Sequence, residues 1–315
     1  MESEVFARLR ITFEKLINQF LKKRELFQKH GQVDTEEEST EYSTIDVYRD
    51  IFVKIGEVTA KCFETCGSDL LKYLTDICSV YKTFLGDSAQ AREQFISLYL
   101  FNTLVEYGGE SALPVYQSWT PFVVQLISSP NPNLRRAAAM GIGLLSEHSQ
   151  TFFPQILGNS ISRLNATINE PSSRDKYFLA ATQTAIATVG RIIQYHPNAI
   201  DLTQVLPIWL NYLPVTSITD ATIIHQQLCH FFVQHTEILL GANCACLPRI
   251  LQLFADVLGT PLVSQETFQN MVSILKKMQS DFPPELMQQS WVALNPIQQG
   301  VFTSALVCFH SLSFR

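Results

Sequence analysis

The stretch NPNLRRAAAMGIGLLSE, residues 131–147, indicates a helix that is packed by neighbours on several sides. Asn131 is a favourable N-cap and Pro132 a favourable first helical residue, so a helix is expected to begin here. A narrow seam of small and apolar residues then recurs at helical spacing: Leu134, Ala138, Gly141 and Leu145. A glycine inside a helix costs about 1 kcal/mol relative to alanine, so two glycines in one turn imply close packing that compensates. A stack of helical hairpins, each touching the one before and the one after, provides such packing.

Helical patterns also dominate the rest of the chain, and the expected fold class is all-α. Strand signals are nearly absent, because no sustained apolar and polar alternation and no Asn-Gly or Asp-Gly turn occurs. Residues 1–30 are predicted to form a first long helix, which carries one apolar stripe: Val5, Leu9, Phe13, Leu16 and Phe20. We expect this helix to end near Lys29, His30 and Gly31, where cations precede a glycine cap.

The clearest change of composition follows this helix. Residues 31–48, GQVDTEEESTEYSTIDVY, contain six acidic residues and no lysine or arginine. We interpret them as an exposed, mobile acidic loop. Such a loop is either a solvated linker or an electrostatic contact for basic protein segments, and the sequence leaves both open.

A recurring proline indicates a repeat. Pro114, Pro154, Pro207 and Pro248 each stand near the start of an apolar helical segment, at spacings of 40, 53 and 41 residues. Leu71-Lys72 takes the equivalent place 42 residues before Pro114. Proline is tolerated there because the first turn of a helix does not use its missing N–H. With one insertion around residues 169–176, the period predicts a superhelical solenoid of about six to seven helical hairpins, with its repeats over residues 49–315.

Composition restricts the classes of partner. Only 17% of residues are charged and the net charge is −6, which argues against nucleic acid or an anionic membrane as a direct partner and favours basic proteins. No apolar run approaches the roughly 20 residues of a membrane helix. Seven cysteines without regular spacing are typical of reduced thiols in an intracellular protein. We therefore expect a soluble protein of cytoplasm and nucleus.

Histidines and cysteines gather in the sequence near residue 230, as they do in some metal sites. His225, His230 and His235 are separated by steps of five residues, each of which turns about 140° beyond a full circle, so they do not share a helix face. Only His225 and Cys229 share one, and Cys244 and Cys246 do not form a C-x-x-C pair. We expect core or surface residues, with no metal and no cofactor.

Motifs for catalysis are also absent from the sequence. There is no G-x-S-x-G elbow, and YGGES (107–111) has two glycines but no lysine and no preceding strand, so it is interpreted as a turn between helices. Pockets with convergent acid, base or metal groups are not indicated. The sequence therefore predicts a non-enzymatic binding protein.

Two further groups have alternative interpretations. The tryptophans Trp119, Trp209 and Trp291 are either anchors for a partner or core residues, and Trp209 is expected to pack between repeats. The basic cluster Lys22-Lys23-Arg24 is either a solvated helix face or a targeting signal.

The opening stretch resembles the second helix of a HEAT repeat. Leu134-Arg135 and Ala138 match the pattern, and Asn131 stands where the pattern favours Asp, so the Asp–Arg ladder between repeats would be weaker here. Over nearly its full length the chain resembles the C-terminal portion of an importin-β superfamily nuclear transport receptor of the karyopherin beta-3 type. The resemblance rests on the charged helix with its acidic loop and on the following segments: KCFETCGSDLLKYL (61–74), RRAAAMGIGLLSE (135–147), VLPIWLNYLPV (205–215), ILLGANCACLPRILQLFADVL (238–258) and LNPIQQ (294–299).

This resemblance implies a non-enzymatic binding scaffold that functions in nuclear import. It implies protein cargo with basic segments and Phe-Gly nucleoporins as partners, and the cytoplasm, nucleus and nuclear pore as locations. It places Ran GTPase among the partners only if an N-terminal arch, outside this chain, is present. Acids of the second helices are the expected contacts for cargo: Glu57, Glu64, Glu106 and Glu147, with Asn131 and Arg135 as ladder residues. Glu57 and Glu64 share a face with Lys61, so local charge pairing is an equal interpretation. A general HEAT-repeat scaffold unrelated to transport is the alternative function.

Overall fold

The computed structural model describes residues 2–30 and 38–312, and no strand occurs among them. The predicted all-α class is confirmed. The α-helices are α1 (Glu2–His30), α2 (Glu38–Cys66), α3 (Leu71–Thr83), α4 (Ala91–Tyr107), α5 (Leu113–Leu126), α6 (Pro132–His148), α7 (Leu157–Asn169), α8 (Leu179–Tyr195), α9 (Leu202–Asn211), α10 (Ile218–Gln234), α11 (Thr236–Leu240), α12 (Leu247–Val257), α13 (Gln265–Asp281), α14 (Pro284–Val292) and α15 (Pro296–Leu312). Short 3₁₀ turns link several of them.

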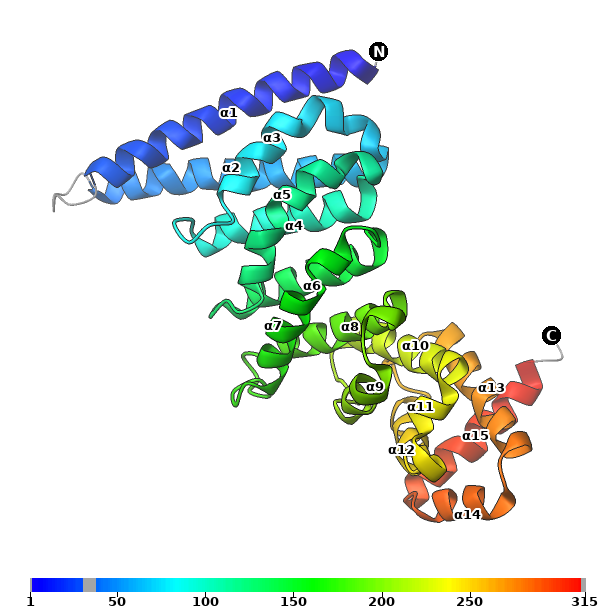
Figure 1. Cartoon of the computed structure of the whole chain (residues 1–315). Helices are drawn as coiled ribbons and strands as arrows, with labels where there is room; N and C mark the ends of the chain where they lie inside the picture. The colour runs from blue at the N-terminus through cyan, green and yellow to red at the C-terminus, as the bar shows by residue number, and fades with distance from the viewer. Residues whose placement is uncertain (1, 31–37, 313–315) are drawn as a thin grey trace. The chain divides into compact units, whose positions relative to one another are not determined.

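The helices follow one another as hairpins, which Figure 1 shows in chain order. In the described part of the chain there are seven pairs: α1–α2, α3–α4, α5–α6, α7–α8, α9–α10, α12–α13 and α14–α15, with the short α11 before α12. From α3 to α12, successive first helices begin at residues 71, 113, 157, 202 and 247, which are 42, 44, 45 and 45 residues apart, and α14 begins 37 residues after α12. The predicted repeat of six to seven hairpins is confirmed.

The proline at 207 was assigned to the wrong place in its helix. Helix α9 begins at Leu202, so Pro207 lies inside it and does not mark its start. The start is set by Asp201, whose carboxylate accepts a hydrogen bond from the backbone N–H of Thr203 at 3.0 Å. The 53-residue spacing therefore results from this shift, and the connection over residues 170–178 does not lengthen the repeat.

The prediction of a loop over residues 31–48 is wrong for residues 38–48. Helix α2 begins at Glu38, so residues 38–48 belong to a helix, and residues 31–37 lie outside the described part of the chain. Acidic residues are favourable in the first turn of a helix, where the backbone dipole is positive. An acidic run followed by an apolar stripe is therefore compatible with a helix start.

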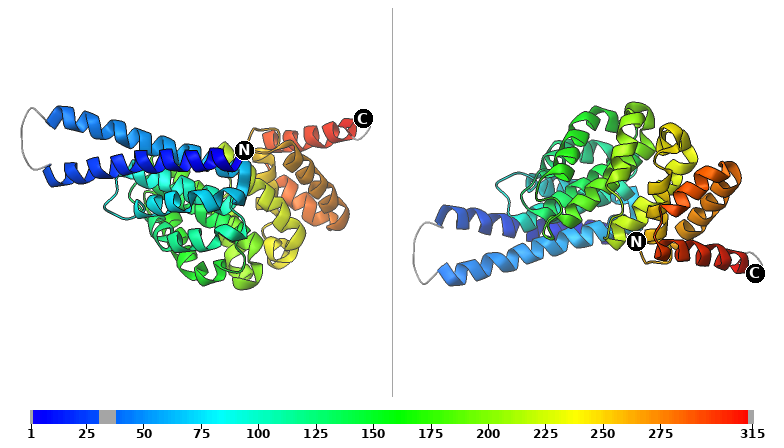
Figure 2. Two further views of the ribbon diagram at one scale, coloured as in Figure 1. Left: turned by 90° about the horizontal axis from the view of Figure 1, so that it is seen from above. Right: turned by 90° about the horizontal axis from the view of Figure 1, so that it is seen from below.

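The chain divides into two compact units, Met1–Arg163 and Leu164–Arg315. In unit 1 the second helices α2, α4 and α6 stack against one another, and the first helices α1, α3 and α5 form a neighbouring layer (Figures 1 and 2). Figure 2 shows α1 and α2 running side by side as a long hairpin. In unit 2 the second helices α8, α10 and α13 stack in the same way.

Helix α6 has the neighbours that its sequence predicts. Asn131 is its N-cap, and its side chain accepts hydrogen bonds from the N–H groups of Asn133 and Leu134. The seam residues are all buried: Leu134, Ala138, Gly141 and Leu145. The helix packs against both α4 and α5. Small residues on α6 thus allow two helices to approach it closely.

The buried face of α1 agrees only in part with the predicted apolar stripe. Phe13, Ile17 and Phe20 are buried, whereas Leu16 is half-buried and Val5 is exposed. Ile17 therefore takes the place expected for Leu16. Among the described helices, none is long and apolar enough to cross a membrane.

Candidate protein-binding surface

A cluster of carboxylates and tyrosines lies where the second halves of α2 and α4 face solvent. Tyr99 on α4 donates a hydrogen bond from its hydroxyl to Glu64 Oε1 on α2 at 3.1 Å. Lys61, one turn before Glu64, forms an ion pair with it. Glu57 pairs with Lys54 at 2.6 Å, one turn nearer the start of α2. Both acids of α2 are thus present on this surface together with lysines of the same helix.

The cluster is electrostatically coupled. A hydrogen bond to Lys61 lowers the pKa of Glu64, and the same contact raises the pKa of Lys61. Partial burial, followed by the hydrogen bond to Glu64, raises the pKa of Tyr99. On α4, the charge of Glu106 and a hydrogen bond to it raise the pKa of Tyr107. Both tyrosines therefore stay neutral near pH 7 and act as hydrogen-bond partners.

Exposed apolar groups accompany these charges on the same helices. Val58 on α2 and Phe95, Tyr99 and Tyr107 on α4 are exposed, and so is Met140 on α6. An open depression of about 460 Å³ lies along α2 beside Glu57 and Lys61. A surface that mixes charge with apolar and aromatic groups is typical of protein-binding faces.

The four predicted acids lie on three helices. Glu57 and Glu64 lie on α2 and Glu106 on α4, whereas Glu147 is half-buried near the end of α6. The interactions described above connect α2 with α4. Local charge pairing, the alternative for Glu57 and Glu64, is present, although Glu57 pairs with Lys54 in place of Lys61.

The predicted ladder residues make contacts close to their own helix. Asn131 caps α6, and Arg135 donates from Nε to the carbonyl oxygen of Ser129 at 2.9 Å. These contacts hold the connection between α5 and α6. A ladder between repeats through Asn131 and Arg135 stays a prediction.

Polar contacts between neighbouring second helices come from residues that the sequence did not single out. Between α8 and α10, the Thr184 hydroxyl donates to Asp220 Oδ1 at 2.9 Å, and Gln227 Nε2 donates to the carbonyl oxygen of Ala187 at 3.2 Å. Between α4 and α6, Asn102 Nδ2 donates to the carbonyl oxygen of Ala137 at 3.1 Å. Polar residues such as these are common in helices, so the sequence alone does not show which of them make contacts between helices.

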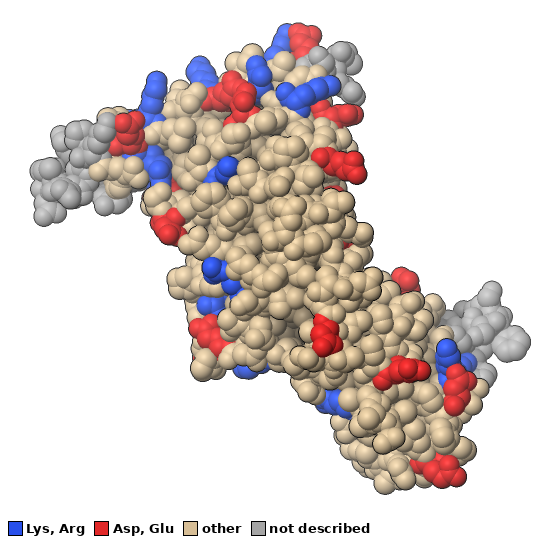
Figure 3. Space-filling model, viewed as in Figure 1, with Lys and Arg blue, Asp and Glu red and all other residues tan. Residues whose placement is uncertain are grey.

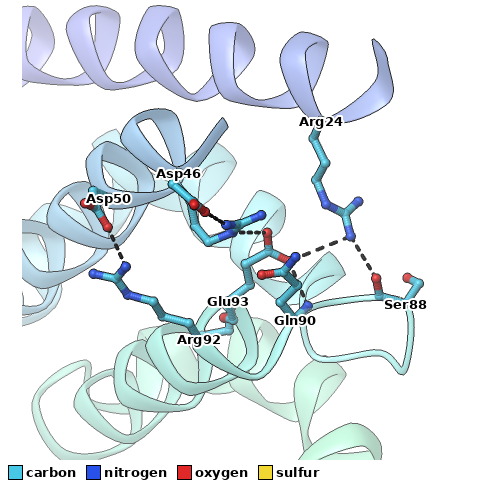
Figure 4. A network of polar contacts seen from close by, with 9 residues as sticks. Arg24, Asp46, Asp50, Ser88, Gln90, Arg92 and Glu93 are labelled. Carbon is cyan, nitrogen blue, oxygen red and sulfur yellow. Dashed lines mark hydrogen bonds and ion pairs between the residues drawn. The ribbon is translucent and has the colours of Figure 1, made fainter. Parts of the chain in front are cut away.

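A buried carboxylate joins α1, α2 and α4 (Figure 4). Glu93 is fully buried at the start of α4, where it accepts a hydrogen bond from the backbone N–H of Gln90 at 2.9 Å. Its oxygens lie 3.3 Å from Arg49 Nε on α2 and 3.7 Å from Arg24 Nη2 on α1. Arg24 also donates to the carbonyl oxygen of Ser88 at 2.9 Å. The third residue of the predicted basic cluster therefore connects helices inside unit 1.

The remaining members of the basic cluster differ from Arg24. Lys22 and Lys23 are exposed on α1, as a solvated helix face requires. At the edge of the Glu93 network, Arg92 pairs with Asp50 at 2.5 Å, with both side chains more than half exposed. Figure 4 shows this second pair beside the buried one.

Two of the tryptophans are core residues. Trp119 and Trp209 are each 1% exposed, whereas Trp291 is half-buried. Trp209 on α9 donates from Nε1 to the carbonyl oxygen of Ile186 on α8 at 3.0 Å and meets Phe231 of α10 edge-on. It therefore packs between repeats, as predicted.

The histidines occupy separate environments. His225 is fully buried on α10, and its Nδ1 lies 3.0 Å from the carbonyl oxygen of Leu262. Burial lowers the pKa of His225 and raises the pKa of Cys229, one turn later, to about 12. His230 and His235 are half-buried beside Phe231.

The Cys244 and Cys246 pair and the YGGES stretch form neither a metal site nor a phosphate-binding loop in the described part of the chain. Cys244 and Cys246 carry free, half-buried thiols. In the part of the chain that the structure describes, no three His, Cys, Asp or Glu side chains gather closely enough to hold a metal ion. Gly109 of the YGGES stretch adopts a φ of 60°, and it lies in the turn between α4 and α5, as predicted.

Charge is sparse on the surface seen in Figure 3. Lys, Arg, Asp and Glu side chains are scattered there over a larger uncharged area. This agrees with a chain of which only 17% is charged.

Comparison with known proteins identifies relatives. No protein-family model matches the chain. The chain is 24% identical over 294 residues to a probable importin-5 homolog of Dictyostelium discoideum, covering 90% of this chain and 27% of the relative. It is 21% identical over 256 residues to importin subunit beta-3 of Saccharomyces cerevisiae, covering 81% of this chain and 23% of the relative. Both relatives are proteins of the importin family, and the chain is similar to them over most of its own length.

Solved structures of that family share the fold. The karyopherin Kap121p bound to RanGTP matches with a TM-score of 0.66 at 16% identity, covering 94% of this chain and 26% of that one. Kap121p bound to Nup53p matches with a TM-score of 0.66 at 17% identity, with the same coverage of both chains. The hairpins described above therefore form the same helical-repeat fold as these karyopherin structures. The chain spans about a quarter of the length of the importin-β family relatives it matches.

Proposed function

We propose that the chain is a non-enzymatic protein-binding portion of a nuclear transport receptor, and that it holds basic segments of protein cargo. The observation that supports this is the cluster of Glu57, Glu64, Glu106, Tyr99 and Tyr107 on α2 and α4. The relatives are importins, and the karyopherin Kap121p has been solved with RanGTP and with Nup53p. The proposal assigns the chain to the C-terminal, cargo-side arch of such a receptor.

The in-chain lysines do not prevent such binding. Lys61 is 73% exposed and Glu64 23% exposed, so their pair lies in contact with water. Exposed ion pairs contribute about 0–1 kcal/mol, because solvent screens them and ordering two side chains costs entropy. A lysine or arginine of a cargo segment can therefore replace Lys61, and the tyrosines add contacts to its aliphatic stem or its charge.

Other partners follow from the same family. Phe-Gly nucleoporins are proposed to bind through grooves of the array, which would place the protein at the nuclear pore and in cytoplasm and nucleus. Ran GTPase is proposed as a partner only of a longer protein that includes an N-terminal arch. The alternative, a HEAT-repeat scaffold unrelated to transport, would bind proteins but would not retain Phe-Gly repeats.

Affinity resins separate these functions. Purified chain is passed over resins that carry either Phe-Gly repeats or a lysine- and arginine-rich peptide, each at several salt concentrations. Retention on both resins is expected. Salt-sensitive retention on the basic peptide alone favours the scaffold, and no retention on either resin contradicts the transport function.

Paired variants test the surface on α2. Glu64→Gln is expected to weaken binding of the basic peptide about threefold to fivefold, because it removes one exposed charge contact. Lys61→Ala is expected to strengthen binding, since the competing lysine is lost. Glu266→Gln, in an exposed first turn of α13, is the matched control and should change nothing. If Glu64→Gln and Glu266→Gln behave alike, the surface on α2 does not bind the peptide.

A further inference from the structure

Two cysteines of α2, Cys62 and Cys66, lie one turn apart on the same face of the helix. Both line the open depression of about 460 Å³ that also touches Glu57 and Lys61. Cys66 is exposed, Cys62 is half-buried, and both thiols are free. A small molecule that enters the depression therefore has access to two thiol groups at once.

The environments of the two thiols differ. Burial raises the pKa of the Cys62 thiol, and the charge of the neighbouring Cys66 raises it further. The thiolate is the nucleophile in thiol–disulfide exchange, so Cys62 is a poor first nucleophile. The exposed Cys66 is expected to react first with a disulfide from solvent. Cys62, which is held beside it on the same helix, then attacks the bond that Cys66 has formed.

The end of α2 gives this pair the freedom to close. Cα atoms one turn apart in a helix are about 6 Å apart, within the range of about 4.4–6.8 Å that disulfides span. Their Cβ atoms, about 5–6 Å apart, have to approach to about 4 Å. Cys66 is the last residue of α2, with a φ of −112°, and Gly67 after it has a φ of 59°. The chain thus leaves the helical conformation at Cys66, where a small shift is enough for closure.

We propose that Cys62 and Cys66 form a redox-sensitive dithiol, which a small-molecule disulfide such as glutathione disulfide closes to an intramolecular disulfide. The Cys66 thiolate attacks one sulfur of glutathione disulfide, whose S–S bond breaks, and the leaving glutathione thiolate takes up the proton that Cys66 lost. Cys62 then loses its proton and attacks the Cys66 sulfur, which releases the second glutathione as a thiol. Two protein thiols are oxidised, and one glutathione disulfide is reduced to two glutathione molecules.

Closure also acts on the neighbouring protein-binding surface, an effect that rests on the proposed function. Glu64 lies in the turn between the two cysteines and accepts the hydrogen bond from Tyr99 of α4 at 3.1 Å. Drawing Cys66 toward Cys62 tightens this turn and shifts the Glu64 carboxylate relative to Tyr99. The closed chain is therefore expected to bind the basic peptide about threefold more weakly than the reduced chain.

Peptide mapping of the full chain tests closure. The chain is incubated at neutral pH with millimolar glutathione disulfide, quenched with acid, alkylated in denaturant and digested with trypsin, which releases both cysteines in one peptide, residues 62–72. We expect this peptide to lose two hydrogen atoms and to take up no alkylating agent, and excess reduced glutathione to reverse the change. Cys62→Ser should accumulate a glutathione adduct on Cys66. In Cys66→Ser the adduct on Cys62 should form about threefold more slowly or less.

Two outcomes would overturn the dithiol proposal. Closure in urea but not in the folded chain, or stable glutathione adducts on both cysteines, would show that the folded helix end holds the thiols apart. The effect on binding is measured with the basic peptide before and after closure, and the double variant Cys62→Ser/Cys66→Ser is the control that should keep its affinity. Equal affinity of the reduced and closed chains would overturn the regulation. Absence of peptide binding by both forms, with the disulfide present in the map, would contradict the proposed function and leave the dithiol established.

Discussion

Gly141 shows why a single residue on a packed helix can fix the distance between repeats. A Cβ at this position would lie 2.4 Å from Asn102 Oδ1 and 3.0 Å from Phe101 Cε1, both on α4. Phe101 is fully buried, so it has little room to move. Alanine is a better helix former than glycine by about 1 kcal/mol, but overpacking a core costs about 1–3 kcal/mol. The overlap is therefore expected to dominate.

We predict that Gly141→Ala lowers the free energy of unfolding by about 1–2 kcal/mol. Urea denaturation followed by circular dichroism measures it. Gly300→Ala is the control, because a Cβ there meets nothing within 4 Å and the residue is exposed on α15. It should be neutral or stabilising. Equal effects of the two changes would show that α4 and α6 have room for a methyl group.

His225 makes stability depend on pH. Its ring is fully buried, Nε2 has no hydrogen-bond partner among the described residues, and burial lowers its pKa below the usual 6.5. Because the unfolded chain then binds a proton that the folded chain does not, the free energy of unfolding falls as pH drops below about 6.5. The slope is at most about 1.4 kcal/mol per pH unit for this proton. Above pH 6.5 the contribution is fully present.

Urea midpoints between pH 7 and 5.5 check this expectation. His225→Gln should flatten the decrease of the midpoint, even if it lowers stability at every pH. His148→Gln changes an exposed histidine on α6 and should leave the slope unchanged. The pKa of His230 is also lowered, by burial and by the charge of His235, so part of the slope is expected to remain. An unchanged slope in His225→Gln would assign the effect to other groups.

At the scale of elements, the sequence predicted helices well where caps and stripes agreed. Asn131 and Pro132 located the start of α6 because N-cap chemistry is local. Pro207 misled because proline is also tolerated inside α9, whose true start is marked by the less conspicuous Asp201. The acidic run at residue 38 was assigned to a loop, since composition alone does not distinguish a solvated linker from a charged helix start.

The candidate site was predicted only where its residues lie on one helix, because sequence spacing shows which residues share a helix face but not which helices meet. Glu57 and Glu64 could be recognised as neighbours because residues seven apart share a helix face. Their contact with Tyr99 depends on how α4 is rotated and shifted against α2. That register is set by buried packing such as Gly56 against Ile96, where a Cβ would lie 2.5 Å from the isoleucine side chain. Pairings between helices are not encoded in either helix alone.

The Glu93 network connects three helices through a charge that water does not reach. Among the described residues, removing Glu93 would leave Arg49 with only its ion pair to the exposed Asp46, and loss of one partner of a buried pair costs about 3–5 kcal/mol. We predict a loss of this size for Glu93→Ala, since Arg49 is only 7% exposed. Arg92→Ala removes an exposed pair with Asp50 and should cost less than about 1 kcal/mol. Thermal or urea unfolding measures both variants. Similar losses of unfolding free energy in the two would show that the buried Glu93 network stabilises the fold no more than the exposed Arg92–Asp50 pair does.

At the scale of the whole molecule, a repeat array predicts how such damage spreads. In solenoids each repeat contacts its neighbours, so stability is a sum of local terms and interfaces between repeats. Glu93→Ala is therefore expected to reduce amide hydrogen-exchange protection in α1, α2 and α4 by about 100-fold or more, which corresponds to about 3 kcal/mol or more. Protection in α10 and α13 of unit 2 should change by less than about threefold. Equal losses in both units would show that the 315 residues unfold as one cooperative body.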